Sequence, residues 1–135
     1  MSPALLARVA LAVYLGAVLA LTLIALPGDP DRLNLIPLRG ILRTFEDRGI
    51  AYGTLQVVGN LLLLAPAGAL LPAAVPGVRL RHVVLGALAV SLAIEVGQLG
   101  VSGRSADIDD LWTNTLSAAI GYAAVGYAAG VPRRR

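Results

Sequence analysis

The stretch Ser102–Gly121, SGRSADIDDLWTNTLSAAIG, places a short polar loop directly before an apolar helix. Its charged and amide side chains are Arg104, Asp107, Asp109, Asp110 and Asn114. Acidic residues before an apolar run are typical of a helix start, because a carboxylate accepts hydrogen bonds from free backbone N–H groups and interacts favourably with the helix dipole. Such capping accounts best for Asp109 or Asp107. It does not account for three acids beside an arginine, so the stretch also predicts a polar functional site.

The composition of the whole chain indicates a membrane protein. Of its 135 residues, 57% are hydrophobic and 14% are charged, whereas a soluble domain is about half apolar and about a quarter charged. The length favours a single domain over residues 1–135. Cysteine is absent, which excludes disulfides, thiolate metal sites and a cysteine nucleophile. The net charge is +3, but the arginines stand at the ends of apolar runs, so we expect a lipid bilayer and no nucleic acid as partner.

Four apolar stretches are long enough to cross a bilayer, and they predict an all-α polytopic membrane protein with four transmembrane helices in a bundle. The predicted helices cover about residues 4–26, 54–71, 82–101 and 111–131, with outer loops at 27–53 and 102–110 and an inner loop at 72–81. The first stretch would extend about 34 Å as a helix, which favours a retained span over a cleaved signal peptide. Pro66 predicts a kink in the second helix, because it removes the hydrogen bond to the Leu62 carbonyl.

The first outer loop contains a candidate interfacial helix. Between Gly40 and Arg48, the apolar residues Ile41, Leu42 and Phe45 fall on one side and the charged residues lie elsewhere. This spacing predicts a short helix in the membrane interface, with its apolar side toward the lipid. A partly ordered loop is the alternative.

The positions of the arginines predict that both termini are cytoplasmic. In that orientation the inner side holds six arginines and no acid, whereas the outer side holds five arginines and seven acids. The inner arginines also lie close to the ends of the spans, as is typical of cytoplasmic loops. The loop that contains Arg104 is therefore expected at the outer face.

This topology places three polar residues from three helices at the same depth. Asn60 and Glu95 are each six residues from the outer end of a predicted span, and Asn114 is about one turn inside the fourth. Ser91, Glu95 and Gln98 share one helix face, and an ionisable residue at membrane depth is expected to face the interior of the bundle. The sequence therefore predicts a polar pocket near the outer surface. Hydrogen bonding between helices is the alternative role for the amide side chains.

The acidic residues of this pocket suggest metal binding more than covalent catalysis. Asp107, Asp109 and Glu95 are weak candidates for holding Mg²⁺ or Ca²⁺ through oxygen ligands, so a divalent cation is the one candidate cofactor. His82 is the single histidine and lies at the cytoplasmic end of the third helix, so a Ser-His-Asp triad cannot form at the outer face.

Several segments, taken in order, resemble the VanZ-like family. They are Asn34-Leu-Ile-Pro37, Asn60 followed by Pro66-x-Gly68, Glu95-x-x-Gln98, Gly103-Arg104-x-x-Asp107-x-Asp109-Asp110, and Asn114-Thr115 through Gly121-Tyr122. The resemblance implies a small multi-pass protein of the bacterial cytoplasmic (inner) membrane. It also implies a shared set of functional polar positions: Asn34, Asn60, Glu95, Gln98, Arg104, Asp107, Asp109, Asp110 and Asn114. The namesake of the family is associated with low-level resistance to teicoplanin, a glycopeptide with a fatty-acyl chain.

Three functions fit these features. The first is an outer-leaflet polar pocket that binds or modulates an amphiphilic cell-envelope ligand, either a lipid-linked precursor or a lipoglycopeptide such as teicoplanin. The second is a metal-assisted membrane enzyme that acts on a lipid-linked phosphate or acyl group. The third is a structural membrane subunit that supports a partner. The sequence predicts no oligomeric state.

Overall fold

The computed structural model describes residues 1–24, 33–99 and 106–128 of the chain. Within these residues the protein is helical apart from one pair of two-residue strands. The helices are α1 (Pro3–Ile24), α2 (Arg39–Leu63), α3 (Ala65–Ala74), α4 (Leu80–Leu99) and α5 (Ile108–Ala128). The strands are β1 (Leu33–Asn34) and β2 (Ala106–Asp107), which pair in parallel.

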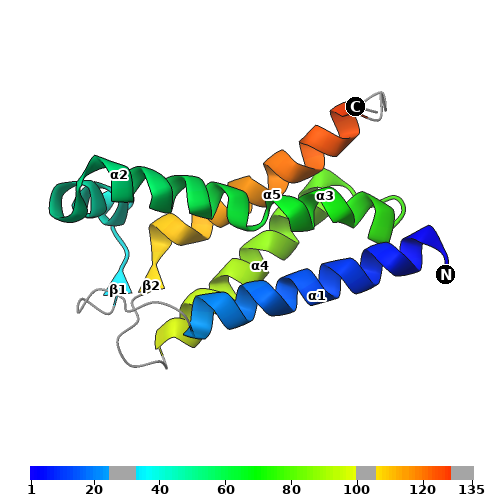
Figure 1. The fold of residues 1–135 in the computed structure, drawn as a ribbon, viewed down its shortest axis with the longest axis horizontal. Coiled ribbons are helices and arrows are strands. Elements are labelled where there is room, and N and C mark those ends of the chain that lie inside the picture. Colours follow the sequence, from blue (N-terminus) through cyan, green and yellow to red (C-terminus); the bar gives the residue numbers. More distant parts are fainter. Residues whose placement is uncertain (25–32, 100–105, 129–135) are drawn as a thin grey trace.

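Helix α5 is at the centre of the bundle. It packs against α2, α3 and α4, and α1 packs against α3 and, less extensively, against α4. The core between the helices contains Val18, Leu64, Val83 and Ile94. The two strands lie at one end of the molecule, whereas the start of α1 and the end of α5 lie at the other end (Figure 1).

Three segments are long and apolar enough to cross a membrane: Pro3–Thr22, Arg39–Ala74 and Leu80–Leu99. Many of their large apolar side chains are exposed, among them Val13, Leu55, Leu85 and Val96. A soluble monomer rarely exposes large continuous apolar patches, so these helices fit a membrane protein. Helix α5 is more polar and is not one of the three segments. The structure is therefore all-helical, as predicted, and three of its described segments are long and apolar enough to be membrane spans, whereas four spans were expected.

The predicted kink in the second span is a complete break. Helix α2 ends at Leu63, and α3 begins after Leu64 with Pro66 in its first turn. The break precedes the proline because Pro66 fits the first turn of a new helix, whereas inside a continuous helix it would clash with the preceding turn and could not donate to the Leu62 carbonyl. The Tyr14 hydroxyl donates to the Leu63 carbonyl at 2.7 Å. The Leu64 N–H donates to the Ser117 hydroxyl at 3.0 Å, so two other helices bond the backbone groups at the break.

Several predicted boundaries were wrong by a few residues. Residues 49–53 were expected in a loop, but α2 continues through them because Gly49, with φ of 81°, lets the chain turn between two helical segments. Helix α3 continues past Pro72 to Ala74, where the Arg8 Nε donates to the Ala74 carbonyl at 2.9 Å and caps the helix end. Helix α5 starts earlier than expected because Asp107 caps its first turn.

The first part of α2, from Arg39 to Arg48, is the short helix expected before the second span. Its apolar side is largely used inside the protein. The Phe45 ring packs on Gly53, where an added Cβ would collide with it, and Ile41 lines an internal cavity. Only Leu42 of the expected apolar side is well exposed. Its place in the membrane interface stays a prediction.

Helices α3 and α5 meet at backbone contact. A Cβ at Gly68 would collide with the Ala118 carbonyl oxygen, and a Cβ at Gly121 would collide with that of Ala65. Small residues permit this close approach between membrane helices. The contact fixes the position of α5 along the broken span, and so fixes where the polar residues of α5 lie.

Candidate functional site

The strand pair joins two segments that are far apart in the sequence. Asn34 in β1 stands opposite Asp107 in β2. The Asn34 Nδ2 donates to the Asp107 Oδ1 at 3.0 Å, and the Asn34 Oδ1 accepts a hydrogen bond from the Ile36 N–H at 3.2 Å. The second bond is typical of an asparagine that stabilises a turn. Asn34 therefore fastens the segment after β1 to the start of α5.

Asp109 is 1% exposed and is bonded by three donors. Its Oδ1 accepts hydrogen bonds from the Leu38 N–H at 2.6 Å and from the Trp112 Nε1 at 3.1 Å. Its Oδ2 accepts one from the Ile41 N–H at 3.2 Å. Leu38 is the N-cap residue of α2 and has no side-chain oxygen that could bond the free N–H groups of the first turn. Asp109 therefore caps α2 from a different helix.

Asp107 links β2 to α5 and α4. Its Oδ1 accepts a hydrogen bond from the Asp109 N–H at 2.9 Å, and its own N–H donates to the Glu95 Oε2 at 2.7 Å. Burial raises the pKa of Asp107 above its ordinary 3.8; the Asp109 N–H lowers it, the charge of Asp109 raises it, and Asn34 lowers it. Glu95 is 7% exposed, which agrees with the expectation that it faces the interior of the bundle.

Asp110 and Asn114 connect α5 to α2 and α4. The Asn60 Nδ2 donates to the Asp110 Oδ1. One turn further along α5, the Asn114 Nδ2 donates to the Ser91 Oγ at 3.3 Å, and the Ser91 hydroxyl donates to the Asp110 carbonyl at 3.5 Å. Asn114 is 3% exposed, and its Oδ1 has no hydrogen-bond partner among the described residues.

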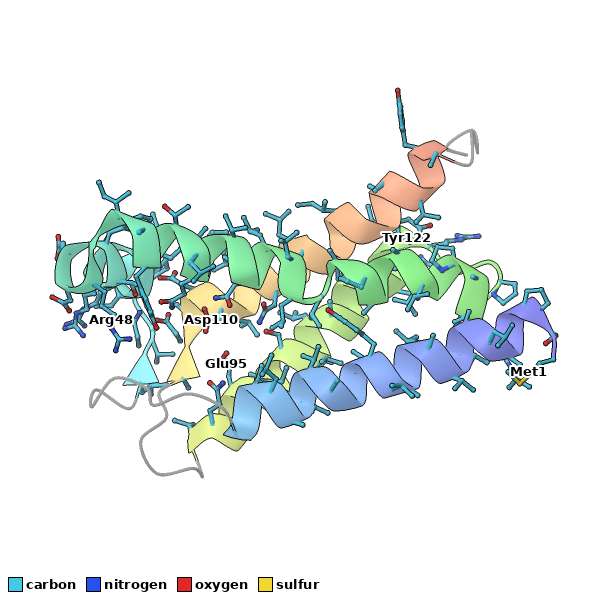
Figure 2. The ribbon with its side chains drawn as sticks, viewed as in Figure 1. Met1, Arg48, Glu95, Asp110 and Tyr122 are labelled. Carbon is cyan, nitrogen blue, oxygen red and sulfur yellow. The ribbon has the colours of Figure 1, made fainter. Side chains whose placement is uncertain are left out.

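These hydrogen bonds gather polar residues from five elements at one end of the molecule. We call the following set the polar clasp: Asn34, Asn60, Glu95, Asp107, Asp109 and Asp110. Figure 2 shows Glu95, Asp110 and Arg48 at this end, and Met1 and Tyr122 toward the other. The clasp carboxylates accept hydrogen bonds from N–H groups of the same chain. These bonds hold the segment from β1 to the start of α2 against α5.

A family model described as VanZ/LLP1 matches residues 11–128. The chain belongs to the VanZ/LLP1 family. The match confirms the resemblance found in the sequence and includes every residue of the polar clasp. No curated protein and no solved structure matches the chain.

The clasp as defined above does not include three residues of the expected VanZ/LLP1 polar set: Gln98, Arg104 and Asn114. Asn114 bonds Ser91 of α4 instead. The Gln98 Nε2 donates to the Thr22 carbonyl at 3.4 Å, so Gln98 joins α4 to the end of α1. Arg104 lies outside the described residues, and its expected pairing with the carboxylates stays a prediction.

Sequence reasoning missed some groups that complete this end of the VanZ/LLP1 protein. Trp112 stands three residues after Asp109 on one helix, and this spacing was a usable signal because such residues are neighbours on the helix surface. The bonds from the Leu38 and Ile41 N–H groups to Asp109 could not be predicted from the sequence, because every residue type except proline has a backbone N–H group.

A cavity of about 10 Å³ lies between α2 and α5. Its polar lining consists of Thr44, Gln56, Asn60, Asp107, Asp109, Asp110 and Thr113. A cavity of this size accommodates about one water molecule, so a sugar or phosphate head group does not fit inside it. Among the described residues, hydrogen bonds within the chain therefore leave little space at the position of the expected polar pocket.

The described residues of the VanZ/LLP1 protein contain no group of three or more acidic or histidine side chains that could hold a metal ion. The weak candidates Asp107, Asp109 and Glu95 use carboxylate oxygens to accept N–H groups. This part of the chain gives no support to the metal ion that the enzyme hypothesis requires.

Proposed function

We propose that this VanZ/LLP1 protein crosses the bacterial cytoplasmic membrane four times and binds an amphiphilic cell-envelope ligand at its outer end. The spans are α1, the broken helix pair α2–α3, α4 and α5. Helix α5 has 21 residues and extends about 31 Å, which matches a hydrocarbon core of about 30 Å. An even number of crossings also agrees with the start of α1 and the end of α5 lying at one end of the molecule (Figure 1).

The polar character of α5 is compatible with a membrane span. Its polar residues Asp109, Asn114 and Ser117 are buried against other helices, whereas Leu116 and Ile120 are exposed. Polar groups in a membrane helix are expected to face the bundle and to bond to neighbouring helices. Helices α2, α3 and α4 separate the polar side of α5 from lipid, so a low mean hydropathy does not prevent it from spanning.

The observation that carries the ligand proposal is the capping of α2 by Asp109, because it holds an amphiphilic surface in place. The exposed residues of this surface are Leu35, Ile36, Leu38, Arg39 and Leu42. Exposed apolar side chains around a cation suit a ligand with a hydrocarbon tail and an anionic head. In this proposal the clasp positions the binding surface and does not touch the ligand.

Two kinds of envelope ligand have this chemistry: a lipid-linked cell-wall precursor and a lipoglycopeptide such as teicoplanin. The family resemblance favours testing the second first. Both termini are cytoplasmic in the proposal, in keeping with the arginines near the inner helix ends. Arg104 would then add a second cation at the outer face.

Teicoplanin susceptibility of a sensitive bacterial host tests this proposal. Wild-type protein is expected to raise the inhibitory concentration above that of an empty vector, and Asp109→Asn is expected to abolish the gain because an amide cannot accept all three N–H bonds. Asp47→Asn makes the same chemical change at an exposed position of α2 and should keep the gain.

A surface variant separates a lost binding surface from a lost fold. Ile36 is 53% exposed and outside the clasp, so Ile36→Ser should reduce the gain while the amount of protein in the membrane stays unchanged. Equal susceptibility of the wild type and the empty vector would contradict the lipoglycopeptide ligand. Full protection by Ile36→Ser would contradict the proposal that this surface binds the ligand.

A further inference from the structure

An apolar groove with a volume of about 470 Å³ runs between α4 and α5. Its lining includes Pro37, Leu88, Leu111, Trp112, Leu116 and Ala119. It lies on the side of α5 that faces away from the buried polar residues. This groove is much larger than the cavity inside the clasp, and the tail of an amphiphile would fit into it.

The lining of the groove offers no free side-chain hydrogen-bond donor to a ligand. Thr115 contributes the only side-chain hydroxyl of the lining, and this hydroxyl donates to the Leu111 carbonyl of its own helix at 2.8 Å. The Trp112 indole N–H is also taken, since it donates to Asp109. A polar head group would lose its hydration there without compensation, whereas hydrocarbon would not. The lining therefore selects an acyl chain.

The length of the groove matches one leaflet. Its lining along α5 runs from Ile108 to Ala119, a rise of about 16 Å, and half of a hydrocarbon core is about 15 Å. Trp112 lies near the outer end of this stretch, at the depth where tryptophan is enriched in membrane proteins. A chain that enters at the outer surface would reach Ala119 near the midplane.

The mouth of the groove favours an anionic head group. Pro37 lines the mouth, and the exposed Arg39 follows two residues later at the start of α2. Asp109, the nearby carboxylate that bonds Trp112, is 1% exposed and engaged by N–H groups, so it presents little charge to a ligand. The exposed charge next to Pro37 in the sequence is therefore the positive charge of Arg39, which attracts an anionic head group.

We infer that the groove between α4 and α5 holds one acyl chain of a phospholipid of the outer leaflet whose head group has a net negative charge, with the phosphate beside Arg39. The choice of leaflet and of an amphiphilic ligand rests on the proposed function. The site itself is new, because it assigns the tail to α4 and α5 and leaves the clasp as the support for Trp112 and for the start of α2.

Trp112 is the only tryptophan of the chain, so its fluorescence reports directly on the groove. Phosphatidylglycerol with brominated acyl chains is titrated into the full-length protein in detergent. Wild-type protein should show saturable quenching of Trp112. Ala119→Phe fills the inner end and should weaken the apparent affinity about tenfold, as expected when roughly two methylenes are no longer buried.

Two further variants control this measurement. Ala124→Phe makes the same change at an exposed position of α5 outside the groove and should leave the affinity unchanged. Arg39→Gln should reduce the affinity for brominated phosphatidylglycerol to that for brominated phosphatidylcholine.

Two results would overturn the inference. One is quenching that rises without saturation and is equal in all variants, as in ordinary solvation by lipid. The other is the absence of quenching in a protein that cross-links as a dimer through α4 and α5, which would assign the groove to a second copy. If either result is found while the protein still protects against teicoplanin, the lipid site in the groove is contradicted and the proposed function is not. If quenching is saturable but the protein gives no protection, the proposed lipoglycopeptide ligand is contradicted and the lipid site is not.

Discussion

Asp109 illustrates how a carboxylate is stabilised when it is almost fully buried. Burying an unpaired charge costs several kcal/mol, and Asp109 avoids that cost through three N–H donors within 3.2 Å. Hydrogen bonds to a charged acceptor are stronger than neutral ones. The same bonds satisfy two N–H groups at the start of α2, so one side chain stabilises two helices.

Asp107 differs from Asp109 because its pKa is raised, mainly by burial. The folded protein therefore holds the Asp107 proton to a higher pH than the unfolded chain does. Protonation favours the folded state, and this contribution is fully present below the ordinary pKa of 3.8 and is lost as pH rises through the folded-state pKa.

We therefore predict that the free energy of unfolding of the wild type falls relative to that of Asp107→Asn as pH rises above 3.8. The neutral amide keeps an oxygen that can accept the Asn34 and Asp109 N–H groups, but it does not titrate. Denaturant unfolding in detergent at a series of pH values measures this difference. A difference that stays constant with pH would contradict the assigned pKa direction.

At the scale of helices, the break between α2 and α3 shows how an irregular backbone is accommodated within a membrane span. Free backbone groups in the hydrocarbon region must be bonded inside the protein. Here Tyr14 from α1 and Ser117 from α5 bond the groups on the two sides of the break. The broken span is therefore held by its neighbours, and its stability depends on their side chains.

Ser117→Ala is predicted to lower the free energy of unfolding by about 1 kcal/mol, because it removes the Ser117 acceptor of the buried Leu64 N–H and leaves only the Leu62 carbonyl. Thr115→Val is the matched control, since the Thr115 hydroxyl bonds only its own helix. Unfolding of both variants in detergent measures the effect. Equal stability of the two variants would mean that Ser117 does not support the break.

The helices themselves were largely predictable from apolar runs, and Pro66 correctly indicated the interruption of the second span. Two features were not predictable in this way. Gly49 turns the chain inside a helix that residue types alone divide into a loop and a span. The N-cap of α2 is supplied by Asp109, which is 71 residues away from Leu38, and a local capping rule cannot identify such a partner.

At the scale of the whole molecule, the polar residues predicted from depth alone do come from helices that meet. Asn60 bonds Asp110, Glu95 bonds the Asp107 backbone, and Asn114 bonds Ser91. What depth could not reveal is that these side chains bond within the bundle, apart from the Asn114 Oδ1, and leave a cavity of about 10 Å³. The groove between α4 and α5 is apolar, and its residues therefore read as ordinary membrane-facing sequence. The segment from Leu35 to Leu42 was expected in an outer loop, and residue types alone did not indicate that Asp109 holds it against α5.

Binding of an outer-leaflet ligand requires that the clasp end of the molecule faces outward. The chain has no cysteine, so single-cysteine variants give an unambiguous signal. Arg48→Cys and Arg79→Cys each replace an exposed arginine, the first in α2 near the clasp and the second between α3 and α4.

Labelling of these two variants in intact cells with a membrane-impermeant maleimide is the most direct test. We predict that the Arg48→Cys variant is labelled in intact cells, whereas the Arg79→Cys variant is labelled only after the membrane is permeabilised. The reverse pattern would place the clasp, the amphiphilic surface and the mouth of the groove in the cytoplasm and would contradict the proposed binding of an outer-leaflet ligand.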